Sequence, residues 1–70
     1  MKNTVTVYEM KAAVKFKKIQ ELAKSLYEEL TEFRENYTIA EDSEENPDNN
    51  FAYLDGALKE LLQSEIEIGE

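Results

Sequence analysis

Apolar residues recur between positions 12 and 37 at alternating steps of four and three, without interruption. This repeat is that of a helix with one apolar stripe, sustained for about three heptads. We call this stripe the seam; it consists of Ala12, Phe16, Ile19, Ala23, Leu26, Leu30, Phe33 and Tyr37. Ala13, Leu22 and Tyr27 flank the seam and widen it, and a wide apolar stripe is typical of a helix with more than one neighbour.

The seam predicts a long helix over residues 6–37. We place its start at Thr6 because Thr6 and Glu9 have the spacing of a capping box, in which each side chain accepts a hydrogen bond from an otherwise unpaired backbone N–H.

A shorter helix is predicted over residues 50–64, with Phe51 and four leucines on one face. Pro47 marks a break before it, because the residue that precedes a proline is pushed out of helical space. Gly56 lies inside this helix at a cost of about 1 kcal/mol relative to alanine, and we expect close backbone contact with the long helix to explain it. The predicted N-cap is Asp48, Asn49 or Asn50.

Both ends of the chain alternate between polar and apolar residues, at positions 4–8 and 65–68. A period of two is typical of short strands, which would pair within one chain or across a dimer. The helix cap at Thr6 would then shift toward Tyr8. The alternative is that residues 3–5 form an extended tail and that Ile66 finishes the second helix.

These elements predict an all-α fold: a two-helix antiparallel hairpin in a single domain, residues 1–70, with an acidic connecting loop over residues 38–49. At about 1.5 Å per residue the helices would be about 45 Å and 20 Å long, so the short helix would cover only about half of the seam. Uncovered apolar surface normally marks an interface. With no cysteine for a disulfide, we expect a second copy to cover it, giving a homodimer and a four-helix-type bundle.

The charge of the chain is −8 and is unevenly distributed. Residues 1–24 carry six lysines against two acids, whereas residues 25–70 carry two basic residues against fourteen acids. Antiparallel packing, within the hairpin or between two long helices, would bring the two halves together. The excess of acids argues against direct binding to nucleic acid or to an anionic membrane. No apolar run is long enough to span a bilayer and none resembles a signal peptide, so we expect a cytoplasmic protein.

Catalytic chemistry is not expected, because histidine and cysteine are absent and the two glycines form no phosphate-binding loop. No cofactor or metal is expected either. Residues 42–50 are rich in oxygen ligands, but they lack the ligand order and the turn glycine of an EF-hand, so a solvated loop is the favoured interpretation.

The predicted function is a small acidic protein–protein interaction module that acts as a homodimeric adaptor or inhibitor of another macromolecule. Two alternatives remain: an acidic nucleic-acid mimic that blocks a DNA- or RNA-binding enzyme, and a small accessory subunit of a larger complex. The competing interpretation of the acids is a surface that serves only solubility, and tyrosines are common at the edge of a core. The candidate partner-binding residues are Tyr27, Tyr53, Glu28, Glu32, Glu35, Asp42, Glu44 and Glu45.

Overall fold

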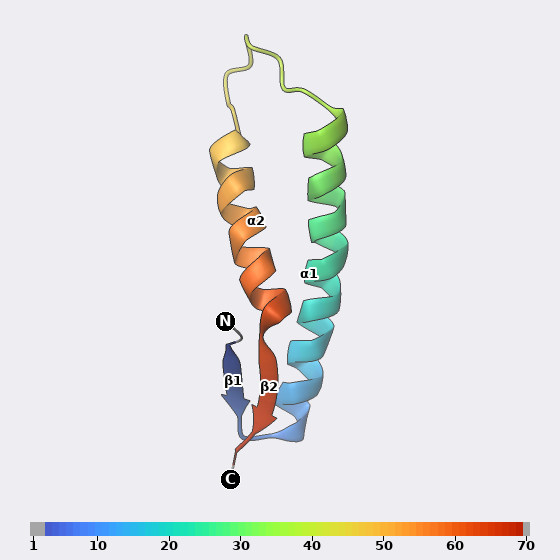
Figure 1. Cartoon of the computed structure of the whole chain (residues 1–70), viewed down its shortest axis with the longest axis vertical. Coiled ribbons are helices and arrows are strands. Elements are labelled where there is room, and N and C mark those ends of the chain that lie inside the picture. The colour runs from blue at the N-terminus through green and yellow to red at the C-terminus, as the bar shows by residue number, and fades with distance from the viewer. Residues whose placement is uncertain (1–2, 70) are drawn as a thin grey trace.

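The computed structural model describes residues 3–69 as a helical hairpin closed at one end by two short strands (Figure 1). The elements in chain order are β1 (Thr4–Val7), α1 (Met10–Asn36), α2 (Asp48–Gln63) and β2 (Glu65–Ile68). The two helices run antiparallel, which confirms the predicted hairpin. Residues 1, 2 and 70 lie outside the described residues, so the ends of the predicted domain and Lys2, one of the six lysines of its basic part, are not described.

The two terminal strands pair with each other in parallel, with Val5 opposite Ile66 and Val7 opposite Ile68. The chain reverses direction between β1 and α1 and again between α1 and α2, and then continues from α2 into β2 without turning (Figure 1). Two reversals leave β1 and β2 pointing the same way, so the helical hairpin serves as the long connection that parallel strands require. The expected strands are therefore present, and they pair within one chain.

The predicted start of the long helix at Thr6 is wrong. Thr6 belongs to β1, and α1 begins only at Met10, with Glu9 at the N-cap and no side-chain capping bond. The backbone oxygen of Glu9 instead accepts hydrogen bonds from the N–H groups of Ala12 and Ala13. Pairing with β2 holds the backbone of residues 4–7 in the extended conformation. A helix capped at Thr6 would instead need residue 7 in its first turn, so the capping box cannot form.

The second helix begins two residues earlier than predicted, and its cap is not one of the three residues proposed. Pro47 occupies the N-cap position, and the Asn46 side-chain oxygen accepts a hydrogen bond from the N–H of Asp48 at 3.0 Å. The expectation for Gly56 is also wrong, because a Cβ added there would meet nothing within 4 Å. The close approach is at Gly69, where a Cβ would lie 2.9 Å from Thr6 Cγ2.

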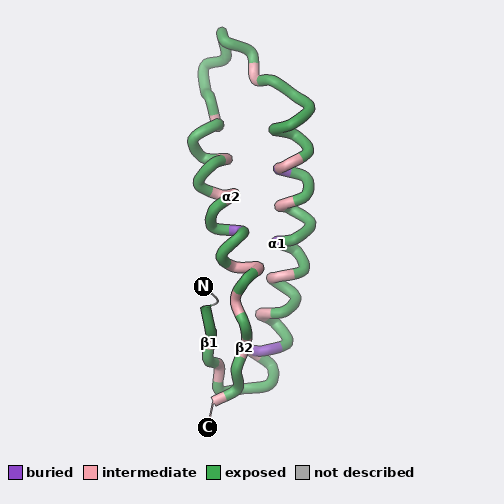
Figure 2. Tube along the Cα trace, viewed as in Figure 1, coloured by how far each residue is buried: buried purple, intermediate pink, exposed green. Residues whose placement is uncertain are grey.

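The core between the helices is small. Ala23, Leu30 and Leu58 are its buried members, and five partly buried side chains pack against them: Tyr27, Phe51, Leu54, Leu61 and Leu62. Most of the chain is exposed or intermediate (Figure 2). The accessible surface is 6088 Å², whereas a compact monomer of 8.1 kDa would expose about 4,500 Å². The fold thus leaves far more surface uncovered than a self-sufficient domain of this size.

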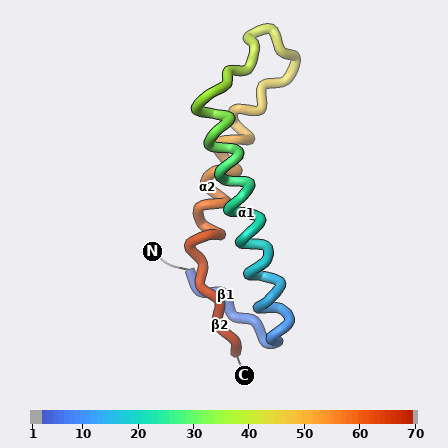
Figure 3. The backbone as a smooth tube through the Cα atoms, turned by 90° about the vertical axis from the view of Figure 1, so that its right-hand side faces the viewer, coloured from blue at the N-terminus to red at the C-terminus, as the bar shows by residue number. Residues whose placement is uncertain are grey.

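The short helix does not leave one end of α1 bare, because β2 continues in line with it beside the first half of α1 (Figure 1). Gln20 lies beside the junction between α2 and β2. Its side-chain amide donates to the backbone oxygens of Leu61 and Ser64, at 2.9 and 3.0 Å. One side of α1 is therefore covered over most of its length, while the side seen in Figure 3 is covered by no other element. The expected half-covered seam is replaced by a helix covered along one side only.

Candidate protein-interaction surface

The seam of α1 is divided lengthwise between the core and the solvent. Ala23 and Leu30 are buried and Phe16 is half-buried. The alternate seam positions are exposed, with relative exposures of 50% for Ile19, 47% for Leu26 and 39% for Phe33. Because α2 and β2 lie against one edge of the seam, the other edge is largely exposed to solvent.

Leu22, which flanks the seam, is 63% exposed and extends this open edge. We call Ile19, Leu22, Leu26 and Phe33 the outer stripe. Their spacing keeps them on one side of the helix over about four turns, with Glu29 at the remaining stripe position. Large apolar side chains aligned along one side of a helix and left in water are the ordinary mark of an interface.

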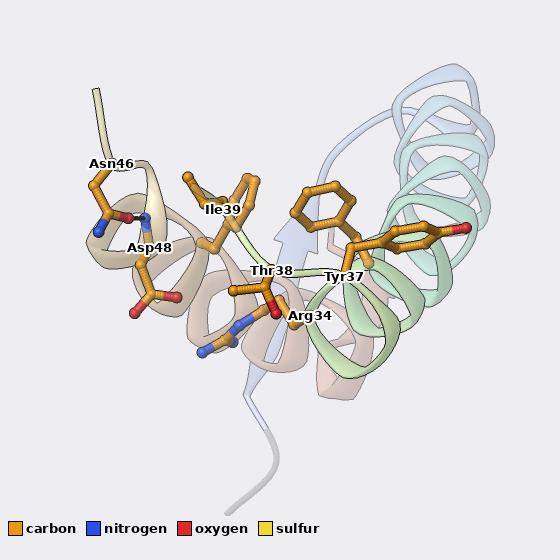
Figure 4. A pocket seen from close by; sticks show the side chains of 8 residues that line it. Arg34, Tyr37, Thr38, Ile39, Asn46 and Asp48 are labelled. Carbon is orange, nitrogen blue, oxygen red and sulfur yellow. Dashed lines mark hydrogen bonds between the residues drawn. The ribbon is translucent and has the colours of Figure 1, made fainter. Parts of the chain in front are cut away.

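At the open end of the hairpin, Phe33 also belongs to an aromatic cluster. Its ring stacks on Tyr37 at 5.5 Å and meets Phe51 edge-on at 5.7 Å. These three rings help to line a shallow pocket of about 340 Å³, shown in Figure 4, with Arg34 and Asp48 at its polar side. The pocket lies between the end of α1 and the start of α2. The contact between Phe33 and Phe51 connects this end of the outer stripe to α2.

Four of the eight predicted partner-binding residues lie together on another side of α1. Glu28, Glu32 and Glu35 are exposed and, with Tyr27, line a surface hollow of about 280 Å³. We call these three glutamates the acidic ridge. Tyr27 is half-buried and packs against the core, so its position is explained by intrachain contacts. The pKa of Lys59 is raised by its hydrogen bond to Asp55 and by the charge of Asp55, with a smaller electrostatic contribution from Tyr27.

The remaining four predicted residues do not join this ridge. Tyr53 is 83% exposed on α2, where it lines a separate hollow with Gly56 and Glu60. Asp42, Glu44 and Glu45 are all exposed in the segment between the two helices. The predicted residues therefore form one ridge and two separate groups.

The outer stripe is the feature that sequence reasoning did not single out. Three of its members belong to the seam and Leu22 to its flank. The sequence predicts that one end of the seam is left uncovered rather than one edge, because one helical repeat fits both a buried side and an exposed side. The only sequence signal was the width of the seam, which Leu22 extends beyond what a single neighbour covers.

Charged residues accompany the outer stripe and differ in sign between its two ends. Lys15 and Lys18 lie near its first residue, whereas Glu29 and Glu32 lie near its last; all four are exposed. Within residues 3–69, none of these four residues takes part in an ion pair. The ion pair that the described part of the chain contains joins Lys59 to Asp55, at 3.1 Å.

No protein-family model, curated protein or solved structure matches the chain. Among the described residues, no cluster of acidic, histidine or cysteine side chains could hold a metal ion, and neither helix is apolar enough over a sufficient length to cross a bilayer.

Proposed function

We propose that this chain is a small cytoplasmic protein–protein interaction module, active as a homodimer that binds another macromolecule as an adaptor or inhibitor. The outer stripe is the observation that carries the proposal. Three of its side chains are about half exposed or more, in a chain whose core has only a few buried residues. Covering this stripe would add the apolar burial that a small cysteine-free domain lacks.

The position of the outer stripe supports a four-helix bundle. Around α1, the outer stripe lies about a quarter turn from the side that faces α2. In a four-helix bundle each helix has two neighbours on adjacent sides, so α2 would occupy one side of α1 and a helix of the second copy the other.

The acidic ridge supports a separate role in target binding. Two of its members, Glu28 and Glu35, lie on the side of α1 away from the outer stripe, so dimerisation would leave them in solvent, whereas Glu32 lies between the ridge and the stripe. A basic protein surface is the partner that this ridge suits, since complementary charge favours encounter and excludes acidic competitors. Tyr53 and the loop acids would add contacts if the target extends over the hairpin.

Mass measurement tests the proposal most directly. We expect the full chain to have twice its monomer mass by light scattering at micromolar concentration. Leu22→Ser with Leu26→Ser should yield a monomer of unchanged helix content by circular dichroism, because both side chains are exposed. The matched control is Met10→Ser with Val14→Ser, two exposed apolar residues on another side of α1, which should stay dimeric.

A chain that is monomeric at every concentration would contradict the homodimer and favour the accessory-subunit alternative. The acidic ridge also leaves the nucleic-acid mimic as a second candidate, because its carboxylates recur at about one helical turn along one line. A mimic should bind a nucleic-acid-binding protein, compete with DNA or RNA for it, and dissociate steeply as salt increases.

A further inference from the structure

We infer that the outer stripe binds the outer stripe of a second copy in the antiparallel direction, with Leu22 of each chain against Leu26 of the other. This inference rests on the proposed homodimer and specifies its interface, which the proposed function leaves open. The occupant is identified by the charges beside the stripe.

Helix direction decides which charges meet. In a parallel pair, Lys15 and Lys18 would lie beside the same lysines of the second chain, and the glutamates beside glutamates. In an antiparallel pair, the basic end of each stripe lies beside the acidic end of the other. Like charges across an interface are unfavourable and opposite charges fix orientation, so the sequence of charges along α1 favours the antiparallel pair.

The register follows from the spacing of the outer stripe. Placing Leu22 opposite Leu26 of the second chain puts the two most central apolar residues at the two-fold axis and aligns residues 15–33 of the two helices, which include the flanking charges, over their full length. Lys18, Ser25 and Glu32 lie along one side of the outer stripe. In this register Lys18 faces Glu32 of the second chain, and Ser25 lies close to Ser25 of the second chain. Lys15 lies near Glu29, and the two-fold axis repeats both Lys–Glu contacts.

The lysines gain a partner that the monomer does not give them. Within the described residues, no acidic side chain pairs with Lys15 or Lys18. The accessible surface of the chain is also large enough for a stable dimer interface. It exceeds the surface expected of a compact monomer by more than roughly 800 Å², which is the area that each partner buries in a standard interface.

Cross-linking tests the orientation, because the chain has no cysteine and single cysteines can be introduced freely. With a short bis-maleimide, an equimolar mixture of the Lys18→Cys and Glu32→Cys variants should give a cross-linked heterodimer. Neither variant alone should cross-link, while Ser25→Cys alone should. The control Lys24→Cys, on the opposite side of α1, should remain uncross-linked.

A dimer in which Lys18→Cys and Glu32→Cys each cross-link alone is parallel and overturns the inference, while leaving the proposed homodimer intact. A dimer that gives none of these cross-links uses another surface and also overturns it. A chain without any dimer refutes the proposed function together with the inference, and light scattering on the same samples separates these cases.

Charge reversal gives an independent measurement on the unlabelled chain. Lys15→Glu with Lys18→Glu should raise the dimer dissociation constant at least about ten-fold at low salt, since four opposite-charge contacts become like-charge contacts. Adding Glu29→Lys and Glu32→Lys should restore it. Lys17→Glu with Lys24→Glu changes the net charge equally on the far side of α1 and should have less than about a two-fold effect. Equal effects of the two lysine pairs would contradict the antiparallel interface.

Discussion

At the scale of single residues, the two glycines have opposite environments. Gly56 faces open space in the middle of α2, and Gly69 lies against Thr6 and the ring of Tyr8, which a Cβ would approach to 2.9 and 3.1 Å. Sequence reasoning assigned the close contact to Gly56, because it could see the cost of glycine in a helix but not the distance to β1. The contact at Gly69 exists only once the ends of the chain are paired.

Gly56→Ala should therefore stabilise the fold. Alanine removes the backbone entropy penalty of glycine in a helix, which is about 1 kcal/mol, and its methyl group meets no neighbour. The free energy of unfolding in urea should rise by about 0.5–1 kcal/mol. Gly69→Ala is the contrasting variant and should be neutral or destabilising, because Thr6 and Tyr8 must shift. A destabilised Gly56→Ala would show that this side of α2 is covered in solution.

Gln20 joins α1 to the end of α2 through its side-chain amide. Its amide donates to the backbone oxygens of Leu61 and Ser64, at the end of α2, where the regular hydrogen bonds of the helix stop. The Leu61 oxygen also accepts a hydrogen bond from the N–H of Ser64, at 3.3 Å. Gln20→Ala should lower the free energy of unfolding by about 1–2 kcal/mol. Gln63→Ala, an exposed glutamine at the same end of α2, is the control and should change it by less than about 0.5 kcal/mol. Equal losses would mean that the two hydrogen bonds add nothing.

At the scale of elements, the strands are held by an arrangement that local preference does not supply. An isolated pair of short strands is at best marginally stable in water, so β1 and β2 depend on the helical hairpin that brings them together. The N–H groups of Glu65 and Gly69 donate to the backbone oxygens of Asn3 and Val7. By the alternation of an extended strand, the N–H of Glu67 also faces β1.

Glu67→Pro should therefore disrupt the strand pair, because proline removes the backbone donor that faces β1. We expect a loss of about 1–3 kcal/mol in the free energy of unfolding and faster amide exchange at residues 4–7. Glu67→Ala removes the same exposed side chain but keeps the N–H, and it should be close to neutral. If the alanine variant lost as much as the proline variant, the side chain rather than the ladder would be responsible.

At the scale of the whole molecule, elongation and lack of burial are linked. The chain extends over 54 × 20 × 19 Å, and the 27 residues of α1 account for about 40 Å of that length. A body of this shape gains most burial by adding a neighbour along its long side, and the outer stripe lies there.

Small-angle X-ray scattering should therefore give a dimer hardly longer than the monomer. Packing along α1 adds a helix layer at about 8–10 Å, so the maximum dimension should stay within about 10–20 Å of the monomer value. A dimer joined end to end, for example through the strands, would be close to twice as long, and that result would exclude the outer stripe as the interface.

The sequence alone determined the helical hairpin, because a long fault-free seam and a proline-marked break leave few alternatives. It placed the end of α1 within one residue and the start of α2 within two. Only the tertiary structure decided what the ends of the chain do, because the backbone of residues 4–7 can form either a helix cap or a strand until β2 lies beside it. It also decided which edge of the seam is buried, since a helical repeat specifies how apolar residues align on a helix but not which side of it a neighbour covers.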